Sequence, residues 1–306
     1  MKNLLRVLLV SAGASMVAVG VACGSFDEAP SLTPSAEAGA DGAADGAVTP
    51  TDGASPDAPA DAGGEACATP CADTRVAMTT EDIRSLGCSA DPNGPIYVGT
   101  STQILAIDKT TFALSVYASR TARHITDNGP TYSTGDQVLK GKAGTLIAAG
   151  QTNAARGVAV NPSTIFWARR DPFEVRTLPR NTGPDAGNVL AALPDFGEGV
   201  LLRANNVYVA IPVLNKIVAF DVDGGAPQAD IQTGESAYAL ANDGAHLYWV
   251  APGAAAIRWV QWATPGTIND FFVAPATSHA MLSICTDDTW VYFGFDHEVH
   301  RLPVVP

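Results

Sequence analysis

A repeated pair of short strands constrains the fold of this chain more than any other feature. An aromatic residue in an apolar run recurs about every 40 residues, and a β-branched residue opens a second apolar run six to nine residues later. The aromatic column is Tyr97, Tyr132, Phe166, Tyr208, Tyr248 and Tyr292, and the second column is Ile104, Val138, Val175, Ile217, Ile257 and Val299. Apolar runs such as "GVAV" (157–160) precede the aromatic and end in Asn or Asp turns. Each unit therefore predicts a small antiparallel sheet.

The number of units predicts how the sheets are assembled. Four short strands in about 40 residues is the spacing of a β-propeller blade, and propellers have about four to eight blades. Six such units fill residues 67–306, so we expect an all-β, six-bladed propeller over 85–306. The last unit ends at Pro306 without a fourth strand, and we expect "TRVAMTT" (74–80), within a lead-in at 67–84, to close the ring. An ordinary β-sandwich with coincidental likeness between units is the alternative.

The first 22 residues are typical of an export signal. Lys2 and Arg6 make the start basic, and residues 7–22 form an apolar run of mostly small residues. This run is shorter than the roughly 20 apolar residues that a membrane-spanning helix needs. We therefore expect residues 1–22 to be a cleaved signal peptide, with a retained helical anchor as the alternative.

The segment that follows, residues 23–66, has the composition of a tether. Beyond its first residue it is rich in Ala, Asp, Gly and Pro, has no Lys or Arg, and contains Phe26 as its one aromatic residue. Such a segment cannot bury enough apolar surface to offset its chain entropy, so we expect it to be disordered.

The whole chain has a formal net charge of −13. Once the basic signal and the acidic tether are subtracted, residues 67–306 are mildly acidic. No basic stripe is present, and nucleic-acid binding is not expected.

The sequence "GVAC" (20–23) resembles the lipobox of bacterial lipoproteins. In that family a small residue precedes a cysteine that is acylated and becomes the mature N-terminus, which assigns the lipid anchor to Cys23. The chain departs from the pattern at Gly20, where the family usually has Leu, Val or Ile. Two or more acyl chains hold a protein stably on a membrane. The resemblance implies a lipid-anchored protein of the bacterial cell envelope, and Gly24 in place of Asp favours the outer membrane, on its periplasmic or surface face.

A second resemblance concerns the propeller. "IFWA" (165–168) and "LYWV" (247–250), followed by "VRTLP" (175–179) and "IRWV" (257–260), resemble six-bladed propellers of the YWTD, NHL and gluconolactonase-like group. The resemblance covers roughly residues 85–306 and implies the fold. No blade has Thr-Asp after Tyr-Trp, as the YWTD pattern requires. A likeness at this level is not an argument for activity.

Four cysteines remain after Cys23, an even number in a protein expected to be exported, where disulfides persist. Cys67 and Cys71 stand before the propeller, whereas Cys88 and Cys285 fall in the first-strand runs of units 1 and 6, which are neighbours if the ring closes. We expect the pairs Cys67–Cys71 and Cys88–Cys285. The alternative is that Cys67 or Cys71 reaches Cys88. A zinc site built from all four thiolates lacks the paired spacing that such sites use.

The channel mouth is the expected place for any ligand. Residues just before the innermost strands line the mouth of a propeller channel, and here they are Arg123 or His124, Arg156, Glu198, Glu235 and His279. Arg156 and Glu198 each stand ten residues before their unit's aromatic, so we expect them to be neighbours. Mixed charge around one axis can bind a small polar ligand. The alternative is that these residues are solvated loop ends.

No motif in the sequence assigns a reaction. No G-x-S-x-G is present, and His297 and His300 of "DHEVH" are three apart, which on a strand directs them to opposite faces. We therefore expect no catalytic residue, no metal ligand and no cofactor. The favoured interpretation is a monomeric, non-catalytic binding or scaffold protein with a protein or small-molecule ligand. The alternative is a gluconolactonase-like hydrolase or lactonase that uses a divalent metal on the channel axis.

Overall fold

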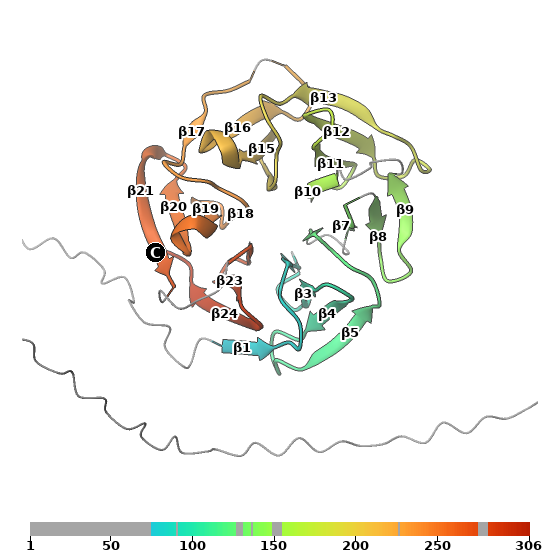
Figure 1. Cartoon of the computed structure of the whole chain (residues 1–306), viewed down its shortest axis with the longest axis vertical. Helices are drawn as coiled ribbons and strands as arrows, with labels where there is room; N and C mark the ends of the chain where they lie inside the picture. Colours follow the sequence, from blue (N-terminus) through green and yellow to red (C-terminus); the bar gives the residue numbers. More distant parts are fainter. Residues whose placement is uncertain are drawn as a thin grey trace, which may run out of the picture. The chain divides into compact units, whose positions relative to one another are not determined.

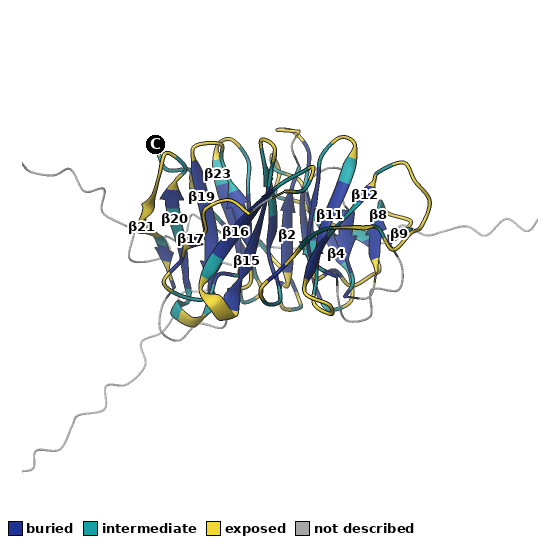
Figure 2. Ribbon diagram, turned by 90° about the horizontal axis from the view of Figure 1, so that it is seen from above, coloured by how far each residue is buried: buried dark blue, intermediate teal, exposed yellow. Residues whose placement is uncertain are grey.

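Six four-stranded antiparallel sheets stand around a central axis as the blades of a β-propeller (Figure 1). The structure is a computed structural model that describes residues 75–306 apart from 90, 127–130, 136, 149–154, 226 and 275–280. Seen from the side, the strands are largely buried, and the exposed residues gather in the turns at the two faces and on the outer strands (Figure 2). The six-bladed propeller expected from the repeat is confirmed.

Each blade runs from an inner strand beside the axis to an outer strand at the rim. Blade 1 is β2 (Ser85–Cys88), β3 (Ile96–Gly99), β4 (Ile104–Ile107) and β5 (Leu114–Ala118). Blade 2 is β6 (His124–Ile125), β7 (Thr131–Ser133), β8 (Val138–Lys140) and β9 (Thr145–Ala148). Blade 3 is β10 (Ala155–Val160), β11 (Thr164–Arg169), β12 (Glu174–Pro179) and β13 (Asn188–Ala192).

The second half of the ring is built in the same way. Blade 4 is β14 (Val200–Arg203), β15 (Asn206–Ile211), β16 (Lys216–Asp221) and β17 (Ile231–Gln232). Blade 5 is β18 (Leu240–Asn242), β19 (His246–Ala251), β20 (Ala256–Gln261) and β21 (Thr264–Val273). Blade 6 is β22 (Ser283–Thr286), β23 (Trp290–Phe295), β24 (Glu298–Pro303) and β1 (Arg75–Met78). Single 3-10 turns, η2 (Pro212–Leu214) and η3 (Pro252–Ala254), join the second and third strands of blades 4 and 5. In the part of the chain that the structure describes, no helix is long and apolar enough to cross a membrane.

The ring closes through a strand from the start of the domain. β1 pairs antiparallel with β24, with Ala77 opposite Val299, and completes blade 6 (Figure 1). A disulfide joins Cys88 of blade 1 to Cys285 of blade 6, with Cα atoms 5.5 Å apart. Both the closing strand and the Cys88–Cys285 pair expected from the sequence are confirmed. Cys23, Cys67 and Cys71 lie outside the described residues.

The core lies between neighbouring blades and explains why one strand pattern recurs. The second strand of a blade is buried on both faces, and all six residues of β19 are buried. Trp167 and Trp249, at equivalent places in blades 3 and 5, are fully buried. Each blade thus presents an apolar face to each neighbour, and burial of this kind is the main stabilising term in folding. A single blade cannot bury both of its faces alone.

The Asn and Asp turns of the repeat hold the first two strands together. In blade 5 the Asp243 carboxylate accepts the backbone N–H of His246 at 2.7 Å and the hydroxyl of Tyr248 at 2.7 Å. In blade 6 Asp287 accepts the N–H of Trp290 at 2.8 Å and the hydroxyl of Tyr292 at 3.3 Å. An acidic turn residue and an aromatic residue five positions later therefore form one local unit.

Close contact between inner strands sets the width of the channel. A Cβ atom added to Gly157 would overlap the carbonyl oxygen of Glu198 in the next blade, and one added to Gly199 would overlap that of Tyr238. Only glycine allows the backbones to approach so closely at these two places. The inner strands of blades 3, 4 and 5 thereby bring the residues just before Gly157 and Gly199 together.

Candidate ligand-binding site at the channel mouth

Six side chains, one from each blade, border a cavity at one end of the channel. Each stands two positions before an apolar residue that lines the channel further in. The six are Arg84, Arg123, Arg156, Glu198, Tyr238 and Leu282. With Asp82, Ile83, His124 and Asp296 they enclose about 480 Å³. This volume falls within the range of roughly 300–1,000 Å³ that is usual for small-molecule sites.

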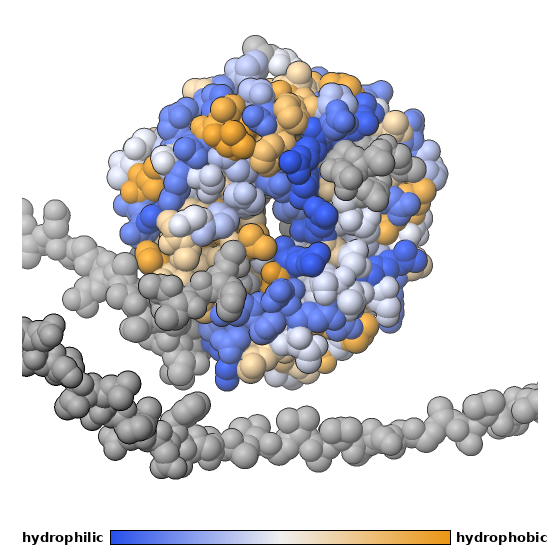
Figure 3. Space-filling view, in the orientation of Figure 1, coloured by the Kyte–Doolittle hydropathy of each residue, from blue (hydrophilic) through white to orange (hydrophobic). Residues whose placement is uncertain are grey.

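The six side chains divide the cavity wall into two halves. Blades 1, 2 and 3 contribute the arginines in succession, whereas blades 5 and 6 contribute Tyr238 and Leu282. Figure 3 shows the opening of the channel with hydrophilic residues along the side of β7 and β10 and hydrophobic residues on the opposite lower edge. We call the two groups the cationic wall (Arg84, Arg123 and Arg156) and the apolar wall (Tyr238 and Leu282).

Glu198 stands at the end of the cationic wall and is itself buried. Its Oε1 lies 3.6 Å from Arg156 Nη1, and its Oε2 lies 3.8 Å from His124 Nε2. Burial on its own raises the pKa of Glu198, but the hydrogen bond and charge of His124 and the charges of Arg156 and Arg170 outweigh it, so the pKa is lowered. Glu198 is therefore a carboxylate at neutral pH and neutralises part of the positive charge at the mouth.

Arg156 is the most deeply placed cation of the mouth, with 16% of its side chain exposed. Burial, together with the charges of Arg123 and Arg170, lowers its pKa, although an arginine remains a cation at neutral pH. Its Nε is buried and makes no hydrogen bond to any group in the described part of the chain. The Ser133 hydroxyl donates to the Arg156 carbonyl at 2.8 Å and fixes the backbone there. The backbone of Arg156 is held in place, while its side-chain Nε–H is unused.

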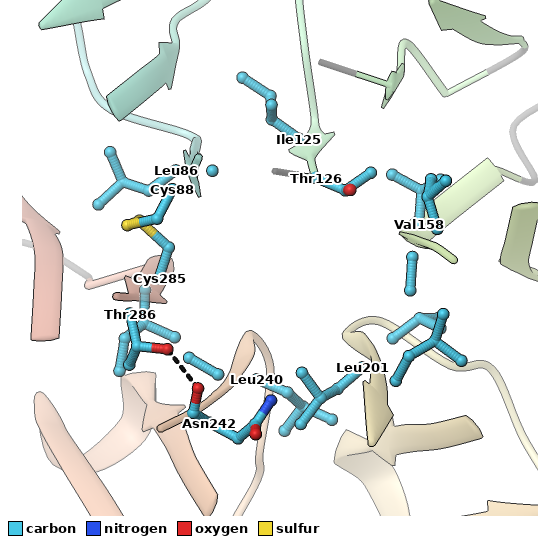
Figure 4. A pocket seen from close by; sticks show the side chains of 17 residues that line it. Leu86, Cys88, Ile125, Thr126, Val158, Leu201, Leu240, Asn242, Cys285 and Thr286 are labelled. Carbon is cyan, nitrogen blue, oxygen red and sulfur yellow. Dashed lines mark hydrogen bonds between the residues drawn. A yellow bond between two sulfur atoms is a disulfide. The ribbon is translucent and has the colours of Figure 1, made fainter. Parts of the chain in front are cut away.

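The channel narrows below the mouth, where aliphatic side chains line it together with Thr126, Asn242 and Thr286. A throat of about 50 Å³ connects the mouth to a lower cavity of about 180 Å³. Figure 4 shows side chains of the lower cavity, among them Leu86, Ile125, Val158 and Leu240, arranged around an open centre. The Cys88–Cys285 disulfide borders the same space. Charge is thus concentrated at one end of the channel, above a ring of aliphatic residues.

Solved structures share this fold. One is a chain of the nidogen/laminin complex, 14% identical, which matches 67% of this chain and 84% of that chain with a TM-score of 0.58. A second is the streptogramin B lyase structure, 12% identical over 74% of this chain and 95% of that chain, with a TM-score of 0.54. A third belongs to the mitotic checkpoint complex, 10% identical over 84% of this chain and 100% of that chain, with a TM-score of 0.59.

At these identities the likeness shows the propeller fold alone. No family model matches the sequence, and no curated protein matches it. The three similar structures include two assemblies and a lyase, which agrees with the general observation that one fold serves many functions. Any function for this propeller must therefore be argued from its own side chains.

The structure brings together four of the site residues proposed from sequence. Arg123, His124, Arg156 and Glu198 all line the mouth, and Arg156 and Glu198 are neighbours as expected. Glu235 does not line the cavity, because its Oε1 lies 2.6 Å from Arg258 Nε in an ion pair of blade 5. His279 lies outside the described residues.

Sequence reasoning missed Arg84, Tyr238 and Leu282, although a usable signal was present. Each stands two positions before an aliphatic residue of the innermost strand, at the same offset as Arg156 and Glu198. Applying that offset to every unit finds all three.

The donors at the mouth do not fit a divalent metal. Among the described residues, no three His, Cys, Asp or Glu side chains gather closely enough to hold an ion. Asp82, Glu198 and Asp296 each border the cavity, but they do so beside three guanidinium groups. Divalent cations such as Ca²⁺ need converging oxygen ligands. His297 and His300 have different partners, Asp82 at 3.5 Å and Glu298 at 3.0 Å, and do not converge.

Proposed function

We propose that the protein is a non-catalytic binding protein of the bacterial cell envelope that takes a small anion at the mouth of its propeller channel. The observation that carries this proposal is the cationic wall. Three arginines from successive blades border one cavity in a chain of formal net charge −13. Asp82, Glu198 and Asp296 border the same cavity, so an anion is favoured only on the side where the arginines gather and repel one another.

The chemistry of the arginine side chains supports an anion with two or more oxygen atoms. A guanidinium group is planar, always charged, and donates in a fork that matches a carboxylate or a phosphate. Arg156 has an unused buried Nε–H, and its carboxylate neighbour Glu198 limits how far the head group can move. The ligand head is therefore assigned to the space in front of Arg123 and Arg156.

The proposed location rests on the N-terminal sequence. The lipobox-like "GVAC" and the following acidic tether support a lipid anchor at Cys23 that holds the propeller at the outer membrane through its acyl chains. Globomycin, which blocks the signal peptidase of lipoproteins, should make the precursor accumulate. Cys23→Ser should release the protein from the membrane fraction. Unchanged processing and fractionation in both tests would contradict the anchor.

The alternative is a gluconolactonase-like hydrolase that uses a metal on the axis. The donor set at the mouth gives it little support, because guanidinium groups occupy three of the six positions there. Metal analysis of the purified protein distinguishes the two. A stoichiometric divalent ion, together with lactone hydrolysis lost in Glu198→Gln, would favour the enzyme over the binding protein.

Isothermal titration of the purified protein with acetate and phosphate, at constant ionic strength, tests the anion site itself. Arg156→Ala should weaken binding by about 10- to 100-fold, the equivalent of one charge-assisted hydrogen bond. The control is Arg203→Ala, which removes the same charge at the far end of β14, where the guanidinium lies over the Trp262 ring. The control should keep the wild-type affinity. Equal losses in both variants, or a loss in neither, would overturn the proposal.

A further inference from the structure

The apolar wall indicates what the anion is attached to. Leu282 is 39% exposed at the mouth, and Tyr238 is half-buried. These side chains face the cationic wall across one cavity of about 480 Å³. A ligand that fills the cavity therefore contacts guanidinium groups on one side and hydrocarbon on the other.

The channel below the mouth does not extend the apolar wall. Aliphatic side chains border the throat together with Arg84, Ser85, His124 and Ser283. The lower cavity of about 180 Å³ exposes more polar than apolar surface, part of it from Thr126, Asn242 and Thr286. The hydrocarbon of a ligand is therefore assigned to the mouth cavity of about 480 Å³, where apolar surface predominates.

We infer that the ligand is an organic anion with an apolar body, such as a medium-chain carboxylate, bound with its head on Arg123 and Arg156 and its hydrocarbon on Tyr238 and Leu282. The inference rests on the proposed function and names the ligand class for the same site. An inorganic anion would leave the apolar wall in water. A sugar would find few partners for its hydroxyl groups on that wall, and burying them unpaired is costly.

A chain-length series is the direct experiment. Acetate, butyrate and hexanoate are titrated into the purified protein at constant ionic strength, with phosphate as the anion that has no hydrocarbon. Burial of each methylene group should tighten binding by up to about fourfold. We expect hexanoate to bind at least tenfold more tightly than acetate, and phosphate to bind no more tightly than acetate.

Three leucine variants locate the hydrocarbon. Leu282→Ser should lower the ratio of hexanoate to acetate affinity at least threefold. The matched control is Leu214→Ser in η2, because Leu214 is exposed to 41% but does not border the mouth. The control should keep the wild-type ratio. Thermal unfolding of both variants identifies any loss that comes from misfolding, and Leu282→Met provides a second variant that keeps the hydrophobic contact and should keep most of the ratio.

The outcomes separate this inference from the proposal on which it rests. If no anion binds, the proposed function fails and the inference fails with it. If acetate, phosphate and hexanoate bind equally well, the anion site stands and the apolar body is overturned. If the ratio of hexanoate to acetate affinity is high in the wild type and unchanged in Leu282→Ser, the assignment of the hydrocarbon to the apolar wall is also overturned.

Discussion

The channel mouth and the seam between blades 1 and 6 contain the same kinds of charged residue and use them differently. At the seam, Lys109 Nζ lies 3.0 Å from Asp287 Oδ2, and the two side chains are only 7% and 15% exposed. Asp287 also accepts N–H groups of Thr289 and Trp290. At the mouth, three arginines border one cavity, and the buried Nε of Arg156 makes no hydrogen bond within the described residues. Paired charge at the seam closes the ring, whereas the arginines gathered on one side of the mouth suit a ligand.

The largest expected effect is at the seam. Asp287→Ala leaves the Lys109 ammonium buried without its partner and removes the cap on the Trp290 N–H, so the free energy of unfolding should fall by about 3–5 kcal/mol. Denaturant unfolding measures this loss. The adjacent, exposed Asp288 provides the control, since Asp288→Ala should change the free energy of unfolding by no more than about 0.5 kcal/mol.

The same carboxylate gives the seam a dependence on pH. Burial on its own raises the pKa of Asp287, but Lys109 and the N–H groups of Thr289 and Trp290 outweigh it, so the folded-state pKa is lowered. The stability it contributes should be complete above the unfolded-state pKa of about 3.9 and be lost as pH falls through the lower folded-state value. Asp287→Asn should remove this part of the acid dependence. An unaltered acid profile in that variant would contradict the role given to Asp287.

The disulfide at the seam should have the next largest effect. It closes a loop with a sequence separation of 197 residues. Replacing Cys88 and Cys285 together by serine should lower the free energy of unfolding by about 2–4 kcal/mol and leave anion affinity close to that of the wild type. Parallel unfolding and titration experiments check both parts. If the double variant lost most of its anion affinity and kept its stability, the disulfide would serve the ligand and not the closure of the ring.

A smaller effect is expected at the mouth, where one substitution should strengthen anion binding. Glu198→Gln removes a negative charge beside Arg156 and should tighten anion binding by roughly two- to fivefold. Glu235→Gln makes the same change of charge outside the cavity, in the ion pair with Arg258, and should leave affinity unchanged. Weaker anion binding in Glu198→Gln would show that the carboxylate serves the ligand directly.

The smallest effect is expected where a charged pair is exposed. Arg75 on the closing strand β1 lies 2.6 Å from Glu298, and their side chains are 49% and 26% exposed. Ion pairs of this kind contribute at most about 1 kcal/mol. Arg75→Ala should therefore lower the free energy of unfolding by less than that amount. A loss as large as that of Asp287→Ala would show that ring closure depends on β1 more than on the buried seam.

The sequence predicted the ring and its closure because backbone pattern alone decides them. The aromatic column marks the second strand of all six blades, and "TRVAMTT" supplies β1. Cys88 and Cys285 could be paired because a closed ring makes their strands neighbours. The strand pattern does not predict which charged side chains pair with one another. Nothing in the sequence shows that Glu235 joins Arg258, or that Lys109 reaches Asp287, because both depend on packing between residues far apart in the chain.

The central claim is that the arginines of the mouth bind a ligand at some expense of stability. Thermal unfolding of the wild type and of Arg156→Gln, each with and without hexanoate at constant ionic strength, tests it most directly. Hexanoate should raise the midpoint of the wild type, as mass action requires for a ligand of the folded state. Arg156→Gln should unfold no earlier than the wild type without ligand and should lose most of the hexanoate-dependent rise. A variant that unfolds several degrees earlier and keeps the full rise would show that Arg156 is a structural residue and would contradict the account.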